Sequence, residues 1–226
     1  MNNVQNATAA APPKRRTRTR WGDREGRRRD ILAAARTLLA RGGYDRLNIR
    51  DVARGARVSA GTVYTYFASR EELFAALYAE RLVAFHDEIA PLAARARTPE
   101  QLFVAVAERY LDVYRVYGRE VNLWAMLADA SRLPPELAQP MIQAAGQIMG
   151  LVGTALGRLG TRLVDAELAI PFLWATLNGL ADHFTGQRHR LHGFSWPDMA
   201  GFAARTLVTG LTQGGAPPRR RKERRR

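Results

Sequence analysis

Hydroxyl-bearing and aromatic side chains crowd the segment 59–70, which reads SAGTVYTYFASR. Val63 and Phe67 are four residues apart, so they share one helical face and are expected to pack into a core. The neighbouring threonines and tyrosines must then face other surroundings. Hydroxyl groups near the positive N-terminus of a helix are suitable donors to phosphate oxygens, and Arg50 and Arg70 flank the segment with cationic donors. The pattern predicts contact with a nucleic-acid backbone; a small helical subdomain with a polar face and no ligand is the alternative.

Two short helices are expected to position this segment. Asn48 is a good N-cap for a helix that carries Ile49, Val52 and Ala53 on one face. Gly55 ends that helix and opens a turn, and Ser59 caps the next helix. Two short helices joined by a tight turn that contains Gly form a helix-turn-helix unit. A third helix is predicted from Arg70, because Ser69-Arg70-Glu71-Glu72 has the form of a capping box.

The sequence GTVYTYFASREEL, within a match from about Arg28 to Leu82, resembles the recognition-helix signature of TetR-like (TetR/AcrR-type) transcriptional regulators. The resemblance implies that Thr62, Tyr64 and Tyr66 grip phosphates and that Arg70 stands where the family has a phosphate-binding lysine. Arg50 and Thr65 match positions that often touch bases. The chain departs from the pattern at Ala60 and Gly61, whose side chains donate no hydrogen bond. The expected DNA-binding residues are Arg50, Ser59, Ala60, Gly61, Thr62, Tyr64, Thr65, Tyr66 and Arg70.

Composition bounds the remaining possibilities. The 226 residues include no cysteine, which excludes disulfides and thiolate metal sites. The sequence has no apolar run of membrane-spanning length and no secretory signal, so a cytoplasmic, nucleoid-associated protein with no membrane partner is expected. The net charge of +14 sits mostly in two arms, since residues 1–29 hold nine Lys or Arg and two acids, and residues 217–226 hold seven and one. Such runs often act as nucleic-acid-binding arms, with a solubilising tail as the alternative.

Apolar residues recur at helical spacing along the rest of the chain, and no strand-like alternation stands out. An all-α fold of about nine helices is therefore expected. The predicted organisation is a disordered basic arm (1–22), a helix-turn-helix DNA-binding domain (23–69), a helical ligand-binding and dimerisation domain (70–213) and a disordered basic tail (214–226). Pro91 and Thr98-Pro99 are expected to bracket the break after the fourth helix, and a shorter helix is expected from Val121 to Ala130.

The middle helices are rich in Tyr, Trp and Met, which suits a cavity for an apolar or aromatic molecule. Ordinary core packing is the alternative for each residue. The expected pocket residues are Phe103, Tyr110, Tyr114, Trp124, Met126, Met141, Met149 and Trp174.

Two further helices close the chain, and the resemblance implies that they pair with those of a second copy in a four-helix bundle. Small residues there would allow close helix approach. The expected interface residues are Ala175, Gly179, Phe202, Ala203 and Ala204. The alternative is that these helices only complete the core of one chain.

Little in the sequence favours an enzyme. His183, His189 and His192 lie near one another, but arginines and Gly193 interrupt the spacing that a metal would need. No catalytic or nucleotide-binding motif appears, so neither a catalytic site, a metal nor a cofactor is expected.

The expectation is a homodimeric DNA-binding regulator, most simply a repressor, released from a palindromic operator by a small-molecule effector. A ligand-independent regulator or architectural protein of the same fold is the second hypothesis, and an enzyme a distant third.

Overall fold

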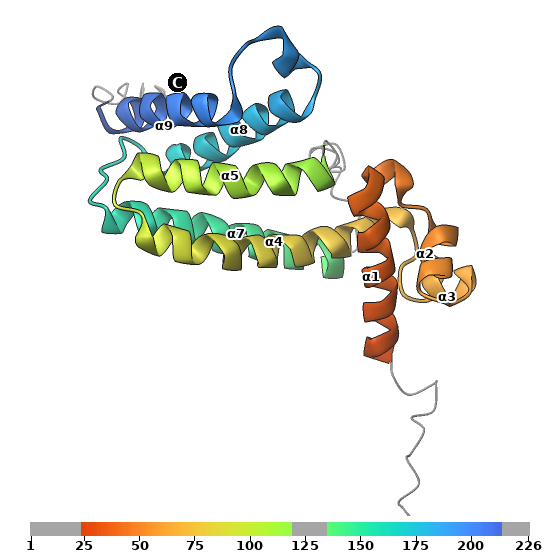
Figure 1. Ribbon diagram of the computed structural model, residues 1–226. Coiled ribbons are helices and arrows are strands. Elements are labelled where there is room, and N and C mark those ends of the chain that lie inside the picture. Colours follow the sequence, from red (N-terminus) through yellow and green to blue (C-terminus); the bar gives the residue numbers. More distant parts are fainter. Residues whose placement is uncertain (1–23, 119–134, 214–226) are drawn as a thin grey trace, which may run out of the picture.

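The computed structural model describes residues 24–118 and 135–213 (Figure 1). In these two ranges the chain forms eight α-helices and two short 3-10 helices, with no strand among them. The all-α prediction is confirmed. The elements are α1 (Arg24–Gly42), η1 (Tyr44–Arg46), α2 (Ile49–Gly55), α3 (Ala60–Tyr64), α4 (Arg70–Arg95), α5 (Pro99–Tyr117), α7 (Pro135–Arg158), α8 (Ala166–Thr185), η2 (Arg188–Leu191) and α9 (Trp196–Gln213). The predicted helix at 121–130 and both basic arms lie outside the described residues.

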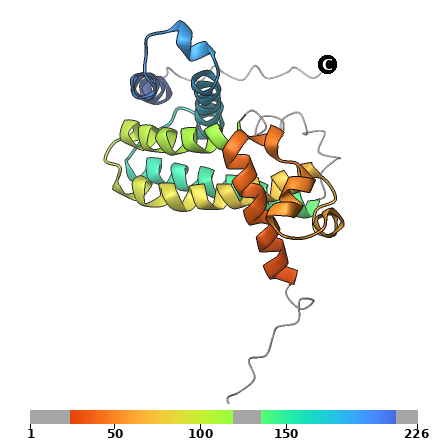
Figure 2. The same cartoon turned by 45° about the vertical axis from the view of Figure 1, so that its right-hand side comes forward.

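Helices α1, α2 and α3 form a small head at the N-terminal end of α4 (Figures 1 and 2). Ile31, Leu32, Ala35 and Leu39 of α1 are buried in the same core cluster as Val52 and Val63 of the head. Helices α1 and α2 approach closely at Gly55, where an added Cβ would lie 3.0 Å from the Cβ of Ala34. A Cβ at this position would require Ala34 to yield by a few tenths of an ångström.

Side-chain caps are present where helices start, including the three predicted at Asn48, Ser59 and Ser69. The side chains of Asn48, Ser59, Ser69, Thr98 and Asp165 each accept a hydrogen bond from a backbone N–H in the first turn that follows. The box at Ser69 differs in one partner. The carboxylate of Glu72 accepts from the backbone N–H of Ala68 at 2.8 Å, one residue before the cap. Both ends of the exchange still satisfy backbone donors that the helix leaves free.

The body is built on α4, which packs lengthwise against α7 and α5 (Figure 1). Ten of its side chains are buried, among them Leu77, Leu82, Phe85 and Ile89. The expectation that the helix breaks at Pro91 is wrong, since α4 continues to Arg95. Proline removes one backbone hydrogen bond, and burial of Ile89 and Ala93 on either side of it holds the last turns in place.

The end of α4 is also stabilised from α7. Arg158 donates from Nη2 to the backbone carbonyls of Ala93 at 2.8 Å and Ala96 at 2.9 Å. These carbonyls lie at the negative end of α4, where a cation is favourable. Arg158, which is distant in sequence, thus caps the C-terminal end of α4, and the sequence around Pro91 gives no sign of this cap.

Helices α8 and α9 form a layer on α5, on the side away from α4 (Figure 1). The loop between them projects from the body and contains η2. Phe184 at the end of α8 contacts Trp196 at the start of α9 with ring centroids 5.4 Å apart. This contact closes the base of the projecting loop. No helix among the described residues is long and apolar enough to cross a bilayer.

Candidate nucleic-acid interface and apolar cavity

The turn between α2 and α3 sets the direction of the recognition segment. Arg57 has a φ of 56°, the left-handed conformation that glycine usually supplies. The N–H of Val58 donates to the carbonyl of Ala53 at 2.9 Å, and the N–H of Arg57 donates to that of Arg54 at 3.2 Å. This is a Schellman-type helix end with Arg57 in the place of glycine. The sequence indicates Gly55 as the residue that opens the turn, but the residue in the left-handed conformation is Arg57.

Helix α3 presents one apolar and one polar face, as predicted. Val63 and Phe67 are buried, whereas Tyr64 is 54% exposed and Gly61 and Thr65 are also exposed. The remaining predicted residues of this segment, Ser59, Ala60, Thr62 and Tyr66, are exposed or half-buried. The structure therefore brings the predicted DNA-binding residues of 59–66 to one short helix and its flanks.

Three of the hydroxyl groups are already engaged within the segment. Ser59 and Thr62 share a hydrogen bond of 2.9 Å between their hydroxyl oxygens, and Thr65 donates to the carbonyl of Gly61 at 3.0 Å. The Ser59–Thr62 pair retains one proton for an acceptor outside the chain. Thr65 as placed offers only an acceptor, so it must rotate before it can donate to a phosphate.

Arg50 and Arg70 stand in different surroundings. Arg50 is exposed on the first turn of α2. The guanidinium of Arg70 lies 4.0 Å from the ring centroid of Tyr44, and its Nε lies 3.8 Å from a carboxylate oxygen of Glu71. Tyr44 in turn donates to Glu71 at 2.9 Å. Arg70 is thus held in one orientation by a ring and an anion, which restricts its freedom before any phosphate arrives.

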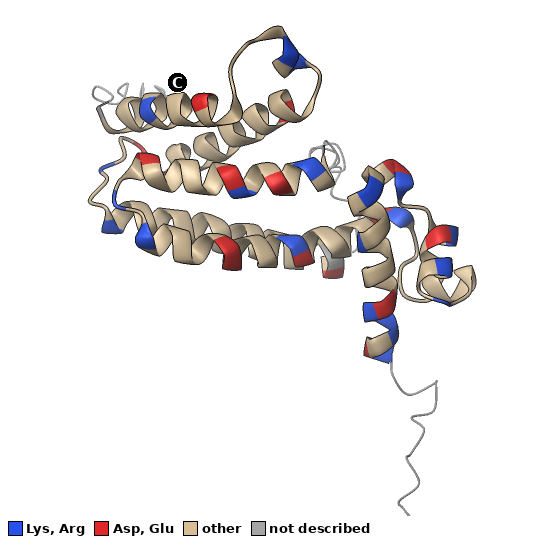
Figure 3. Cartoon of the chain, in the orientation of Figure 1, with Lys and Arg blue, Asp and Glu red and all other residues tan. Residues whose placement is uncertain are grey.

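The contacts among Tyr44, Arg70 and Glu71 shift the pKa of both the tyrosine and the carboxyl group. Burial raises the pKa of Tyr44, and its hydrogen bond to Glu71 raises it further. Desolvation favours the neutral form of Glu71, but hydrogen bonds from the backbone, Tyr44 and Ser69 and the charge of Arg70 together lower the pKa of its carboxyl group. Glu71 therefore stays ionised beside Arg70. Figure 3 shows cationic residues on α1 and α2 around this end of the molecule.

A cavity of about 60 Å³ lies among α5, α7, α8 and α9. Every side chain that lines it is apolar. The lining residues are Pro99, Leu102, Phe103, Val106, Ile148, Met149, Val152, Leu156, Ile170, Leu173, Trp174, Leu177 and Val208. A volume of this size holds a few water molecules, but the indole N–H of Trp174 is the one strong hydrogen-bonding group among the lining side chains.

Three of the eight predicted pocket residues line the cavity: Phe103, Met149 and Trp174. Tyr110 lies behind that wall, with its ring centroid 4.9 Å from that of Trp174. Met141 packs against the core from the first half of α7, away from the lining residues. Trp124 and Met126 lie outside the described residues. The aliphatic lining residues of α7 and α8 were not predicted, because apolar residues at helical spacing also occur in an ordinary hydrophobic core.

The tyrosine hydroxyls expected as polar tips point to α8. Tyr110 donates to the amide oxygen of Asn178, and Tyr114 donates to a carboxylate oxygen of Asp182 at 3.1 Å. The two pairs repeat at a spacing of four residues on both helices, so they fix the register of α8 on α5. Burial raises the pKa of Tyr110 strongly, which keeps its hydroxyl protonated as a donor.

The predicted interface residues divide into two groups. Ala175 and Gly179 are exposed on α8, and Phe202 is 59% exposed on α9. Ala203 and Ala204 are 7% and 1% exposed, because α9 packs this face against α5 within one chain. The expectation that these two alanines meet a second copy does not fit their position: their small side chains permit close approach of α9 to α5 instead.

The three histidines of the α8–α9 region do not form a metal site. The rings of His183 and His192 stack with centroids 5.4 Å apart, and Nδ1 of His189 lies 2.7 Å from the carbonyl of Gly186. Among the described residues, no group of three His, Asp or Glu side chains is placed to hold a metal ion.

The head and the start of α4 match a known protein family. Residues 31–77 match the family described as "Bacterial regulatory proteins, tetR family". The fatty acid metabolism regulator protein of Bacillus subtilis (strain 168) is 26% identical over 81 residues, a segment that covers 35% of this chain and 42% of that protein. The match to that relative therefore spans less than half of its length.

Other matches extend beyond the head. The HTH-type transcriptional repressor NicS of Pseudomonas putida is 24% identical over 214 residues, which cover 89% of this chain and 97% of that protein. The crystal structure of the transcriptional regulator FadR from Bacillus subtilis in complex with stearoyl-CoA shares the fold, with a TM-score of 0.53 and 18% identity over 82% of this chain and 98% of that one. The head therefore carries the helix-turn-helix sequence of the tetR family over residues 31–77, and the whole chain is similar to TetR-like transcriptional regulators in sequence and in helical architecture.

Proposed function

We propose that the chain is a homodimeric repressor that binds a palindromic operator in the cytoplasm, at the nucleoid, and leaves it when a small apolar molecule enters the cavity. One observation carries the proposal. A helix-turn-helix head and a body with a wholly apolar cavity are joined by one continuous helix, Arg70–Arg95. A displacement of α4 must therefore move the head.

The DNA side of the proposal is supported by the exposed face of α3. Tyr64 and the Ser59–Thr62 pair lie on this helix and its flank, and the oriented Arg70 begins α4 shortly after it. These groups suit phosphate oxygens. Ala60 and Gly61 allow close approach to the groove floor but read no base by side-chain hydrogen bonds. Base discrimination by the head then falls mainly on Arg50, whose guanidinium suits guanine.

The dimer is supported by an exposed apolar stripe on α8. Leu168 and Phe172 are 68% and 51% exposed, and with Ala175 and Gly179 they follow at intervals of four, three and four residues. Phe202 of α9 is 59% exposed. Large apolar groups left in water mark interaction surfaces when they are contiguous on one face, and a second copy of the same stripe would cover them.

The ligand class follows from the cavity wall. Apart from the indole N–H of Trp174, the thirteen lining residues offer no strong side-chain hydrogen-bonding group that would orient a polar molecule, so an aliphatic or aromatic ligand is the match. Ligand sites usually measure about 300–1,000 Å³, so α8 must move outward for a ligand to enter. The stearoyl-CoA bound by the Bacillus subtilis neighbour has an acyl chain of this character. A ligand that binds the widened state better shifts the protein toward it.

A second candidate is a regulator of the same fold that needs no ligand. The small volume of the cavity favours it, since about 60 Å³ is also the size of a packing defect between helices. In that case α8 stays in place and operator affinity does not respond to apolar compounds.

Selection of bound fragments from a random DNA pool tests the proposal. The full chain should enrich one palindrome, and a panel of fatty acids, acyl-CoAs and aromatic compounds should contain a member that releases it. Enrichment without release by any member supports the ligand-independent regulator. Absence of any enriched sequence contradicts both.

A further inference from the structure

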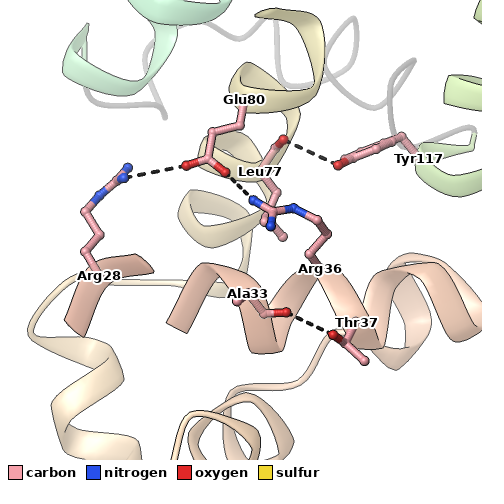
Figure 4. A network of polar contacts seen from close by, with 7 residues as sticks. All are labelled: Arg28, Ala33, Arg36, Thr37, Leu77, Glu80 and Tyr117. Carbon is pink, nitrogen blue, oxygen red and sulfur yellow. Dashed lines mark hydrogen bonds and ion pairs between the residues drawn. The ribbon is translucent and has the colours of Figure 1, made fainter. Parts of the chain in front are cut away.

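Two arginines of α1 converge on a single carboxylate of α4 (Figure 4). Nη2 of Arg36 lies 2.6 Å from Oε2 of Glu80, and Nη1 of Arg28 lies 3.8 Å from Oε1. Arg28 and Arg36 are eight residues apart, which is about 12 Å along a helix. Because Glu80 is held at two points on α1, it opposes rotation of α1 over α4 more than a single pair would.

Arg28 also connects this contact to the recognition segment. Its guanidinium carbon lies 5.5 Å from the ring centroid of Phe67, which is buried just after α3. The side chain therefore touches α1, the end of the recognition segment and α4 together. A change in the position of Glu80 is transmitted to the segment that would face DNA.

The same turn of α4 is held from the other side by α5. The hydroxyl of Tyr117 donates to the backbone carbonyl of Leu77 at 3.4 Å (Figure 4). The ring of Tyr117 packs against those of Phe74 and Tyr78, with centroids 5.8 and 5.6 Å apart. The other end of α5 forms one wall of the cavity through Leu102 and Phe103. The turn around Glu80 is thus the place where the head and the cavity helix meet α4.

We propose that Glu80 is a positioning residue, which fixes the orientation of the head on the body through its paired contacts with Arg28 and Arg36. The orientation claim concerns the free protein, and only its readout on DNA rests on the proposed function. The two ion pairs are partly exposed, with side-chain exposures of 38% and 55% for the arginines and 40% for Glu80. Their effect is therefore modest and falls with salt.

The chain contains no cysteine, so spin labels can be placed at will. We choose Arg54→Cys on the head and Gln147→Cys on α7, both at exposed positions. Labelled chains are diluted into an excess of unlabelled chains, so that each distance is measured within one chain by pulsed electron spin resonance. The variant is Glu80→Gln, which keeps the shape and removes the charge.

The matched control is Glu88→Gln, two turns further along α4. Glu88 forms a two-point pair with Arg81 of the same helix, at 2.7 and 3.0 Å, and does not bridge to the head. A reversed set, Arg28→Glu, Arg36→Glu and Glu80→Arg together, restores opposite charges with the partners exchanged. Thermal melting confirms that each variant is folded.

The expected result is a broader head-to-body distance distribution for Glu80→Gln than for the native chain or Glu88→Gln, with a narrow distribution regained in the reversed set. Salt at 0.5 M should broaden the native distribution toward that of Glu80→Gln. Affinity for a selected operator should fall about two- to fivefold for Glu80→Gln, the range of exposed ion pairs. Equal distributions for Glu80→Gln and Glu88→Gln would overturn the proposal, whether or not the chain binds DNA. An unchanged head-to-body distance distribution in Glu80→Gln would count against the role of Glu80. Failure to select any operator would count, independently, against the proposed function.

Discussion

Replacement of Arg70 by alanine is the sharpest probe of the recognition face. The guanidinium is pinned between the ring of Tyr44 and the carboxylate of Glu71, with 38% of the side chain exposed. One side is therefore covered by the protein, and the exposed remainder is what a phosphate would meet. Arg70→Ala removes this cation and leaves the hydroxyl groups of α3 in place.

The magnitude follows from counterion release. Each neutralised phosphate contributes about 0.9 to the slope of log K against log salt, and the proposed dimer on a palindrome would use Arg70 twice. The slope should flatten by up to about 1.8, and by less to the extent that Glu71 already neutralises the charge. Between 50 and 200 mM salt, this reduces the salt-dependent loss of affinity by about tenfold. Loss of the contact with Tyr44 costs about 0.5–1 kcal/mol of folding stability, which leaves the domain folded.

Fluorescence anisotropy on one labelled operator and one random duplex, each over a range of salt, measures this slope. The loss for Arg70→Ala should be equal on both duplexes, because phosphates carry no sequence information. Arg54→Ala is the control, since the side chain of Arg54 is 80% exposed on α2 and pairs with Asp51 of the same helix, at 2.7 Å. If Arg54→Ala and Arg70→Ala flatten the slope equally, the proposed docking of α3 is refuted.

Three other substitutions test separate parts of the account. Arg50→Ala should relax the preference at one base position by about 1–3 kcal/mol, measured by repeating the selection; an unchanged consensus would remove Arg50 from base reading. Phe172→Glu should give monomers by sedimentation at micromolar concentration, whereas Ile142→Glu, at a position 62% exposed on α7, should not; dimers in both would exclude the α8 stripe. Tyr44→Phe should lower stability at neutral pH, because the hydroxyl helps to lower the pKa of Glu71 below its ordinary value of 4.5. A lowered carboxyl pKa stabilises the fold above that ordinary value, and the contribution disappears as pH falls through the folded pKa, so urea melts of the two proteins should converge in acid; a gap that persists there would contradict the assignment.

Local signals in the sequence were sufficient to predict helix starts. Asn48, Ser59 and Ser69 cap the helices that they were expected to cap, because a cap depends on a backbone N–H only three positions away. The continuation of α4 past Pro91 was not predictable in this way. It depends on packing and on Arg158, which lies 65 residues from Ala93 in the chain.

Contacts between distant helices account for the other differences. The hydroxyls of Tyr110 and Tyr114 donate hydrogen bonds to residues 68 positions further along the chain. No local sequence pattern could show that these hydroxyls have hydrogen-bond partners on α8. The small side chains of Ala203 and Ala204 were expected to allow another helix to approach α9 closely. One does, but it is α5 of the same chain. Small residues indicate that a neighbour comes near and do not say which neighbour.

The most direct test of the central claim is reciprocity between the cavity and the head. The apolar compound that releases the operator in the screen is titrated into the protein alone and into the protein saturated with operator DNA, by calorimetry. Linkage requires the operator to weaken binding of the compound by the same factor by which the compound weakens operator binding. The account predicts two equal factors, each abolished by Trp174→Ala or another change in the cavity wall that prevents binding of the compound. A compound that occupies the cavity with the same affinity in the presence and absence of saturating operator would contradict the account.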